Sequence, residues 1–133
     1  MPSTRRATDG DRPAVAALFR EAGWEGDPVF DEAWVACEED RVVGAVTVLD
    51  AEPELAFIDA IVVSRDLRGR GVASDMLADV LSTRHTTWWL ECRQELLPFY
   101  TRKDFEVATD VPSSIRALVP PRTDRAQTFL RRG

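Results

Sequence analysis

The strongest constraint on the fold is a strand, turn, helix and strand that follow one another in the middle of the chain. Residues 55–63 form an almost unbroken apolar run, which predicts a buried strand. After a turn that contains two glycines, apolar residues recur at helical spacing over 72–81. A second apolar run covers 86–92. Because a helix joins them, the two strands are expected to lie parallel in one sheet.

Shorter patterns predict the elements on either side of this unit. The chain starts with a short strand, followed by a helix that has Pro13 in its first turn and ends at Gly23. The full set of expected elements is a strand at 4–8, a helix before Gly23, hairpin strands at 33–37 and 42–49, a short helix at 95–102, a helix or turn at 111–118, and strands at 105–108 and 126–131. This order predicts a single mixed α/β (α+β) domain over residues 1–133.

Charge and composition exclude several classes of partner. The formal net charge is −6, and Lys103 is the only lysine. Because nucleic-acid binding draws most of its affinity from Lys and Arg on phosphates, no nucleic-acid partner is expected. An acidic surface suits a cationic amine, although it also serves plain solubility. No apolar run approaches the roughly 20 residues of a membrane span, so no membrane partner is expected.

The cysteines and the histidine predict neither a metal site nor a disulfide framework. Cys37, Cys92 and the single His85 fit no ligand spacing of a structural metal. Both cysteines lie in apolar runs, where a free cysteine is usually a small buried side chain. The charged start of the chain is not followed by the apolar segment of a signal peptide, so a reducing, cytoplasmic location is expected.

The segment between the central strand and helix predicts an anion site. A helix start presents unpaired N–H groups and partial positive charge, and the glycines let a phosphate approach the backbone. A Walker-type loop is excluded because the segment has no lysine. A dinucleotide fingerprint, with Ser74 as its third small residue and Glu91 as its acid, is disfavoured because the chain lacks two βαβαβ halves.

Two blocks of sequence narrow the kind of phosphate ligand. The first block is Arg68-Gly69-Arg70-Gly71-Val72-Ala73, and the second is Leu97-Pro98-Phe99-Tyr100-Thr101-Arg102-Lys103-Asp104-Phe105. At this spacing they resemble the Gln/Arg-x-x-Gly-x-Gly/Ala and Phe-Tyr-x-x-x-Gly-Phe motifs of the GNAT superfamily of N-acetyltransferases. The order of elements is similar along almost the whole chain. The resemblance implies a mostly antiparallel central sheet with a splayed parallel strand pair and helices on both faces.

The resemblance further implies that acetyl-CoA is the acetyl donor. Backbone amides of the first block would hold the pyrophosphate, and the edge of Val63 would pair with the pantetheine amides. The implied cofactor-binding residues are Ile61, Val62, Val63, Arg68, Gly69, Arg70, Gly71, Val72, Ala73, Ser74, Arg93 and Tyr100.

Three side chains are expected to carry the chemistry. The resemblance puts Tyr100, the only tyrosine, at the family's general-acid position, where it would protonate the leaving thiolate. Asp59 is the first candidate base, because a carboxylate in an apolar strand indicates that the strand opens onto a groove. Glu91 is the competing base, and a chain of waters is the third alternative. An acylated Cys92 is disfavoured because the motif brings no histidine base near it.

The acceptor is the least constrained part of the prediction. Trp24 and Phe30 fall where the family's acceptor loop usually lies, and Trp89 and Asp59 could line the same pocket; core packing is the alternative for these aromatic residues. The expected acceptor is a small-molecule amine or an amino acid. A protein N-terminus or lysine, and a non-catalytic acetyl-CoA-binding or regulatory module, stay open. A homodimer is possible by the same resemblance.

Two residues depart from the family pattern. Asp104 replaces the glycine of Tyr-x-x-x-Gly-Phe, at a position expected to need φ > 0, which Asp tolerates better than most residues. Arg93 stands where many members carry an asparagine that contacts the cofactor. These departures leave open how strongly the chain binds CoA.

Overall fold

The computed structural model describes residues 2–133, which divide into two compact units. Unit 1 comprises the residues up to Val48 together with Asp59–Arg84, and unit 2 comprises Leu49–Ile58 and His85–Gly133. Two long strands contribute residues to both units, because the chain passes from one unit to the other within each of them.

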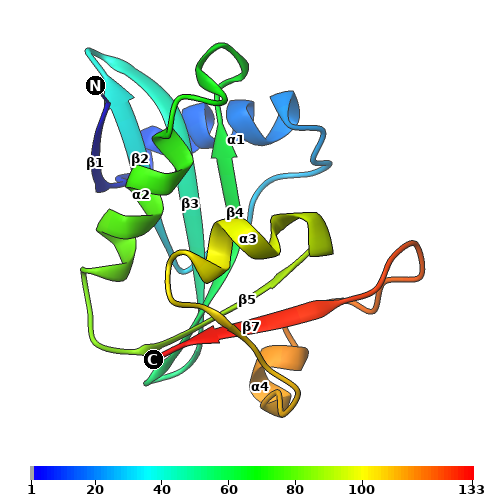
Figure 1. Cartoon of the computed structure of the whole chain (residues 1–133). Coiled ribbons are helices and arrows are strands. Elements are labelled where there is room, and N and C mark those ends of the chain that lie inside the picture. Colours follow the sequence, from blue (N-terminus) through cyan, green and yellow to red (C-terminus); the bar gives the residue numbers. More distant parts are fainter. Residues whose placement is uncertain (1) are drawn as a thin grey trace. The chain divides into compact units, whose positions relative to one another are not determined.

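The helices and strands follow the predicted order (Figure 1). They are β1 (Ser3–Arg6), α1 (Arg12–Glu21), β2 (Glu32–Glu38), β3 (Arg41–Glu52), β4 (Leu55–Val63), α2 (Val72–Leu81), β5 (Thr87–Cys92), α3 (Leu97–Thr101), β6 (Glu106–Val107), α4 (Ser113–Arg116) and β7 (Thr128–Arg132), with 3₁₀ turns at Asp9–Asp11, Arg65–Leu67 and Gln94–Leu96. None of the helices within residues 2–133 has both the length and the apolar content that a bilayer span requires.

The strands form one mixed sheet in the order β1-β2-β3-β4-β5-β7-β6. The predicted parallel pair is present, with Leu55 beside Thr87 and Phe57 beside Trp89. The pairs β1–β2, β2–β3, β5–β7 and β6–β7 are antiparallel. The predicted fold class is therefore confirmed. The divergence of β4 from β5 beyond the paired residues stays a prediction.

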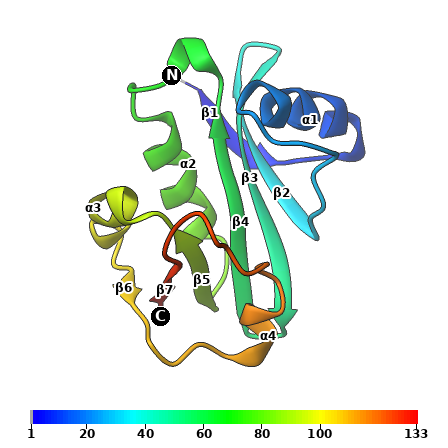
Figure 2. The ribbon, with the colours of Figure 1, turned by 90° about the vertical axis from the view of Figure 1, so that its right-hand side faces the viewer.

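In unit 1, α1 and α2 lie on opposite faces of the strands (Figure 2). The apolar stripe of α1 packs through Val15, Leu18 and Phe19 onto a cluster that includes Val35 and Val62. The helix ends before Gly23, whose φ of +90° is a conformation that glycine adopts without strain. Hydrophobic burial of this stripe is the main term that holds α1 on the sheet.

On the opposite face of unit 1, the side chain of a residue of α2 packs against a glycine of β3. Met76 of α2 is fully buried, and a Cβ at Gly44 of β3 would lie 2.8 Å from its Cε. An alanine at position 44 would therefore require the end of the Met76 side chain to move, and its Cβ would also lie 3.3 Å from the Val62 carbonyl oxygen. The absence of a side chain at Gly44 thus leaves room for the buried Met76 side chain.

Unit 2 has its own apolar core. Phe57 of β4, Trp89 of β5 and Phe129 of β7 pack together with Ile115, which α4 contributes. The sequence pattern predicts a helix or a turn over residues 111–118, and the structure has a helix of four residues there, α4. Its fully buried Ile115 explains why so short a helix forms there, since tertiary packing rather than propensity stabilises it.

The first strand is shorter than predicted. The pattern indicated a strand at 4–8, but β1 ends at Arg6. The Thr8 N–H donates to the Asp11 carboxylate at 2.7 Å, and Arg5 donates to the same carboxylate at 2.7 and 2.9 Å. This capping arrangement turns the chain into α1 and ends the strand early.

Candidate active site

The turn that connects β4 to α2 contains two glycines in a left-handed backbone conformation. Gly69 has φ +80° and Gly71 has φ +83°, both in the left-handed region. A Cβ at either position would meet nothing within 4 Å. The glycines are therefore needed for the backbone conformation, and the surface of the turn is open to a ligand.

The start of α2 provides donors for such a ligand. Gly71 is the N-cap residue and no side chain caps the helix. The first N–H groups of a ten-residue helix have no intrahelical partner and carry partial positive charge. Val72 is buried, whereas Ala73 and Ser74 are half-buried in this first turn. These groups fit a phosphate or pyrophosphate.

Two arginines of the turn add positive charge beside the glycines. Arg68 and Arg70 are both exposed, and the Arg68 Nε donates to the carbonyl oxygen of Val63 at 3.2 Å. This bond folds the Arg68 stem back over the end of β4. Guanidinium groups at this position suit charge-assisted bonds to phosphate oxygens.

The strand that leads into the turn presents alternating faces. Ala60 and Val62 are buried in the core of unit 1, whereas Asp59, Ile61 and Val63 are half-buried. The predicted shared face of Asp59 and Val63 is thus confirmed. Burial raises the pKa of Asp59 above the ordinary carboxyl value. A carboxylate with a raised pKa is a better base.

Tyr100 lies on α3 among aromatic rings of unit 2. Its ring meets Phe99 edge-on at 5.0 Å and Phe105 at 5.9 Å. Burial, with a smaller contribution from the Cys92 thiol, raises the pKa of Tyr100 to about 12. The phenol is therefore protonated at neutral pH and can serve as a proton donor.

The structure tests the prediction made for Asp104, but not the one made for Arg93, at the two positions that depart from the family motif. Asp104 has φ +68°, which confirms the predicted positive φ. The chain turns back there, because the Phe105 N–H donates to the Tyr100 carbonyl at 3.3 Å. Arg93 is exposed at the N-cap of the 3₁₀ turn Gln94–Leu96, and its contact with a cofactor stays a prediction.

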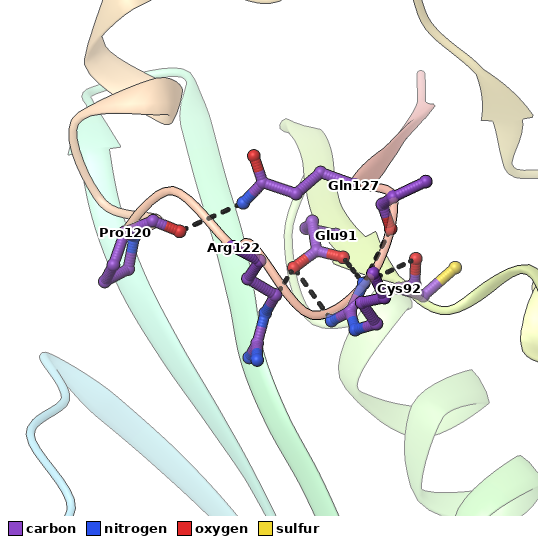
Figure 3. A network of polar contacts seen from close by, with 7 residues as sticks. Glu91, Cys92, Pro120, Arg122 and Gln127 are labelled. Carbon is purple, nitrogen blue, oxygen red and sulfur yellow. Dashed lines mark hydrogen bonds and ion pairs between the residues drawn. The ribbon is translucent and has the colours of Figure 1, made fainter.

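Glu91, the competing base, belongs to an ion-pair network of unit 2 (Figure 3). Its carboxylate is 4% exposed and accepts from Arg125 at 2.6 and 3.1 Å. Arg122 contributes a longer contact of 3.4 Å. The same loop is closed by a bond of 3.0 Å from Gln127 Nε2 to the Pro120 carbonyl. The carboxylate of Glu91 holds the loop on β5, which favours Asp59 over Glu91 as the base.

Cys92 has the properties of a buried structural thiol. Both cysteines are free, and Cys92 is 4% exposed. Burial and the neighbouring Glu91 carboxylate raise the pKa of Cys92 to about 11. Since the thiolate is the nucleophilic form, this environment disfavours an acyl-enzyme on Cys92.

The predicted acceptor residues differ in exposure. Trp24 is 42% exposed, with its ring 5.1 Å from that of Phe19. Phe30 lies under the Arg12 guanidinium, 4.8 Å from the ring centre, and lines a hollow of about 260 Å³. The other lining residues are Arg12, Pro13, Ala16, Asp27 and Pro28. Trp89 is buried in the core of unit 2, so its side chain serves packing there.

Sequence reasoning missed the arginines that neutralise two acidic residues. Arg125 and Arg122 were not assigned to Glu91, and Arg41 was not assigned to Asp66, which it contacts at 3.0 Å. No spacing rule pairs residues so far apart in the chain. Within the described part of the chain, no three His, Cys, Asp or Glu side chains are grouped as a metal site requires.

A match to a family model identifies the protein family of the segment that contains the glycine turn. Residues 30–107, more than half of the chain, match the model described as the acetyltransferase (GNAT) domain. The chain belongs to the GNAT family of acetyltransferases. The resemblance drawn from the two sequence blocks is therefore confirmed, and this GNAT protein carries an acetyltransferase domain. No curated protein sequence matches the chain significantly.

Solved GNAT structures share the fold at low sequence identity. N-acetylglutamate synthase from Neisseria gonorrhoeae, complexed with coenzyme A and N-acetyl-glutamate, has a TM-score of 0.75 and 18% identity over 99% of this chain and 35% of that chain. Naa50 from Arabidopsis thaliana, complexed with the bisubstrate analogue CoA-Ac-MVNAL, has a TM-score of 0.74 and 16% identity over 99% of this chain and 98% of that chain. The GNAT chain thus spans about a third of the Neisseria synthase.

A third relative acts on a diamino acid. Diaminobutyrate acetyltransferase EctA from Paenibacillus lautus, complexed with L-2,4-diaminobutyric acid and coenzyme A, has a TM-score of 0.73 and 16% identity over 100% of this chain and 95% of that chain. At these identities the likeness establishes the fold shared by the GNAT proteins.

Proposed function

We propose that this protein transfers an acetyl group from acetyl-CoA directly to the primary amine of a small molecule or amino acid. The observation that carries the proposal is the open glycine turn at the start of α2, within the stretch that matches the family model. Neighbours solved with coenzyme A or a CoA analogue support the same cofactor.

Residues of unit 1 would hold the cofactor. Backbone N–H groups from Arg68 to Ala73 would donate to the pyrophosphate, with Arg68 and Arg70 as additional donors. The half-buried edge of Ile61 and Val63 would accept and donate bonds along the pantetheine chain. When bound, acetyl-CoA supplies a thioester, which is an activated acetyl group.

Tyr100 would donate the proton that the leaving sulfur needs. A raised pKa of about 12 keeps its hydroxyl protonated throughout the neutral range. The rings of Phe99 and Phe105 pack edge-on against the Tyr100 ring, and these contacts would help to keep the hydroxyl in place for proton transfer.

Asp59 would accept the proton of the attacking amine. Its carboxylate is half-buried on β4, and burial raises its pKa. This supports Asp59 over Glu91, whose carboxylate is occupied by two arginines. A water relay between the amine and Asp59 is consistent with the same role.

The acceptor class is supported by the charge of the chain and by its neighbours. The net charge of −6 favours a cationic amine. Two of the similar structures hold an amino acid or its acetylated form, and a third holds a peptide-derived analogue. We favour a free amino acid or small amine over a protein N-terminus, and we extend the proposal to a cytoplasmic enzyme that can form homodimers.

The decisive experiment combines binding with turnover. Calorimetry of the protein with CoA should show association, and a thiol reagent should report CoA release when acetyl-CoA meets an amine from a panel of amino acids, diamines and peptides. Binding without thiol release from any amine would favour a non-catalytic acetyl-CoA-binding module instead. Absence of binding to CoA and acetyl-CoA would refute the proposed function.

A further inference from the structure

The segment that carries the chain from β4 into the glycine turn is held by a triangle of polar side chains in unit 1. Arg41, the first residue of β3, donates from Nη1 and Nη2 to the two oxygens of Asp66, each at 3.0 Å. Its Nη2 also donates to the hydroxyl oxygen of Ser64 at 2.7 Å. The Ser64 hydroxyl donates in turn to Asp66. We call these three residues the Arg41 brace.

Backbone contacts and α1 anchor the same segment. Ser64 is 2% exposed, and its N–H donates to the Val43 carbonyl at 2.7 Å. On the other side, Glu21 at the end of α1 accepts the N–H of Arg65 through its carboxylate. The Arg65 Nη2 donates to the Glu21 carbonyl oxygen at 3.1 Å. Residues 64–67 are thus fixed to both β3 and α1.

The glycine turn itself has no comparable support. Gly69 and Gly71 have open space where a side chain would be, and residues 68–71 are all exposed. Among the described residues, the one side-chain hydrogen bond from the turn is that of Arg68 to the Val63 carbonyl. The position of the turn is therefore set by its two ends, which are residues 64–67 and the first turn of α2 with its buried Val72.

The brace also controls the charge next to the turn. The hydrogen bonds from Arg41 and Ser64 hold the pKa of the Asp66 carboxyl well below its usual range, so Asp66 is ionised. A bare carboxylate two residues before Arg68 would oppose a phosphate. Paired with Arg41, its charge is offset.

We propose that Arg41 is a positioning residue for the cofactor, acting through Asp66 and Ser64 on the glycine turn. The bidentate pair fixes the direction in which the chain leaves β4, and it offsets the Asp66 charge before the phosphates arrive. This inference rests on the proposed function, since it assigns Arg41 to the binding of CoA.

The test compares Arg41→Ala and Arg41→Lys with Arg20→Ala as a matched control. Arg20 is an exposed arginine of α1, so its removal changes the net charge equally. We expect Arg41→Ala to raise the Kd for CoA and the KM for acetyl-CoA about five-fold, with kcat within about two-fold of the native value. The Kd and KM of Arg41→Lys should lie between those of the native protein and of Arg41→Ala, because lysine keeps the positive charge but cannot form the two parallel hydrogen bonds of a guanidinium group. Arg20→Ala should behave as the native protein does.

A second measurement needs no cofactor. Hydrogen exchange at the Ser64 and Leu67 amides should become faster in Arg41→Ala and stay unchanged in Arg20→Ala, since the Ser64 amide bonds the braced segment to the Val43 carbonyl and the Leu67 amide donates to the Ser64 carbonyl. If the native protein binds CoA while Arg41→Ala and Arg20→Ala match in affinity or in exchange, the positioning role is wrong and the proposed function stands. If the native protein binds no CoA, the positioning role of Arg41 and the proposed function are both refuted.

Discussion

The Glu91 carboxylate and the Arg125 guanidinium form a two-bond ion pair, with 2.6 Å between Oε2 and Nη1 and 3.1 Å between Oε1 and Nη2. Only 4% of the carboxylate side chain is exposed, against 20% of Arg125. The Arg125 Nη1 also donates to the Ala126 carbonyl at 3.1 Å. These contacts tie the segment before β7 to β5, which is a structural role that sequence spacing did not reveal.

Glu91→Gln should destabilise the protein without abolishing catalysis. It leaves Arg125 largely buried without its counter-charge, so the free energy of unfolding should fall by about 2–4 kcal/mol. Urea unfolding at pH 7 measures this loss, and kcat of the folded variant should stay within about three-fold of native. Arg122→Ala should cost below about 1 kcal/mol, because Arg122 is 44% exposed. A hundred-fold loss of kcat with unchanged stability would instead make Glu91 the base.

Asp59→Asn should lower the catalytic activity and raise the thermal stability of the protein. The folded pKa of Asp59 is raised by burial above the unfolded value of 3.8, so the folded state binds more protons in that window and stability falls as pH rises through it. At pH 7 the neutral asparagine removes this penalty, and Tm should rise. The kcat should fall about 10²-fold, and the acidic limb of the rate profile should vanish. The control is Asp79→Asn, a substitution of an exposed residue of α2, which should change neither Tm nor kcat. A kcat equal to the native value in Asp59→Asn would exclude Asp59 as the base.

Tyr100→Phe should affect the chemical step and leave cofactor binding intact. The phenylalanine keeps the edge contacts with Phe99 and Phe105, so the Kd for CoA should stay native. Loss of the proton donor should lower kcat about 10²–10³-fold. Since the pKa is raised from 10.0 to about 12, stability of the native protein should decline between those pH values, and this decline should be smaller in the variant. Equal kcat in both proteins would contradict the acid role.

Gly71→Ala should weaken cofactor binding through backbone strain. Its φ of +83° costs an L-residue about 1–2 kcal/mol, although a Cβ would meet no atom within 4 Å. The matched control is Gly23→Ala, which has φ +90° and equally open space outside the turn. Both variants should lose similar stability in urea, and only Gly71→Ala should lose affinity for CoA in calorimetry. An equal loss of CoA affinity in Gly71→Ala and Gly23→Ala would show that the glycine turn has no specific role in CoA binding.

Short-range patterns predicted most of the fold. β4 runs from Leu55 to Val63 and α2 begins at Val72, as their apolar periodicity indicated. The positive φ of Asp104 followed from its place after a helix. In each case the deciding interactions involve residues close in the sequence, so the pattern itself carries the information.

The polar networks could not be predicted from the sequence. Glu91 and Arg125 are 34 residues apart, and Arg41 and Asp66 are 25 apart. Many arginines are available, and only the folded backbone determines which of them reaches a given carboxylate. The same limit applies to Trp89, because strand parity alone did not show that its ring packs on the core of unit 2.

The division of the strands between the two units has a consequence during synthesis. Every residue of unit 1 has been made once the chain reaches Arg84. Residues 49–58 of unit 2 have also been synthesised by then, but Trp89 and Ile115, the core partners of Phe57, are translated afterwards. Until these partners are synthesised, the packing that buries Phe57 cannot form, so we expect its ring to add to the apolar surface through which the nascent chain can aggregate.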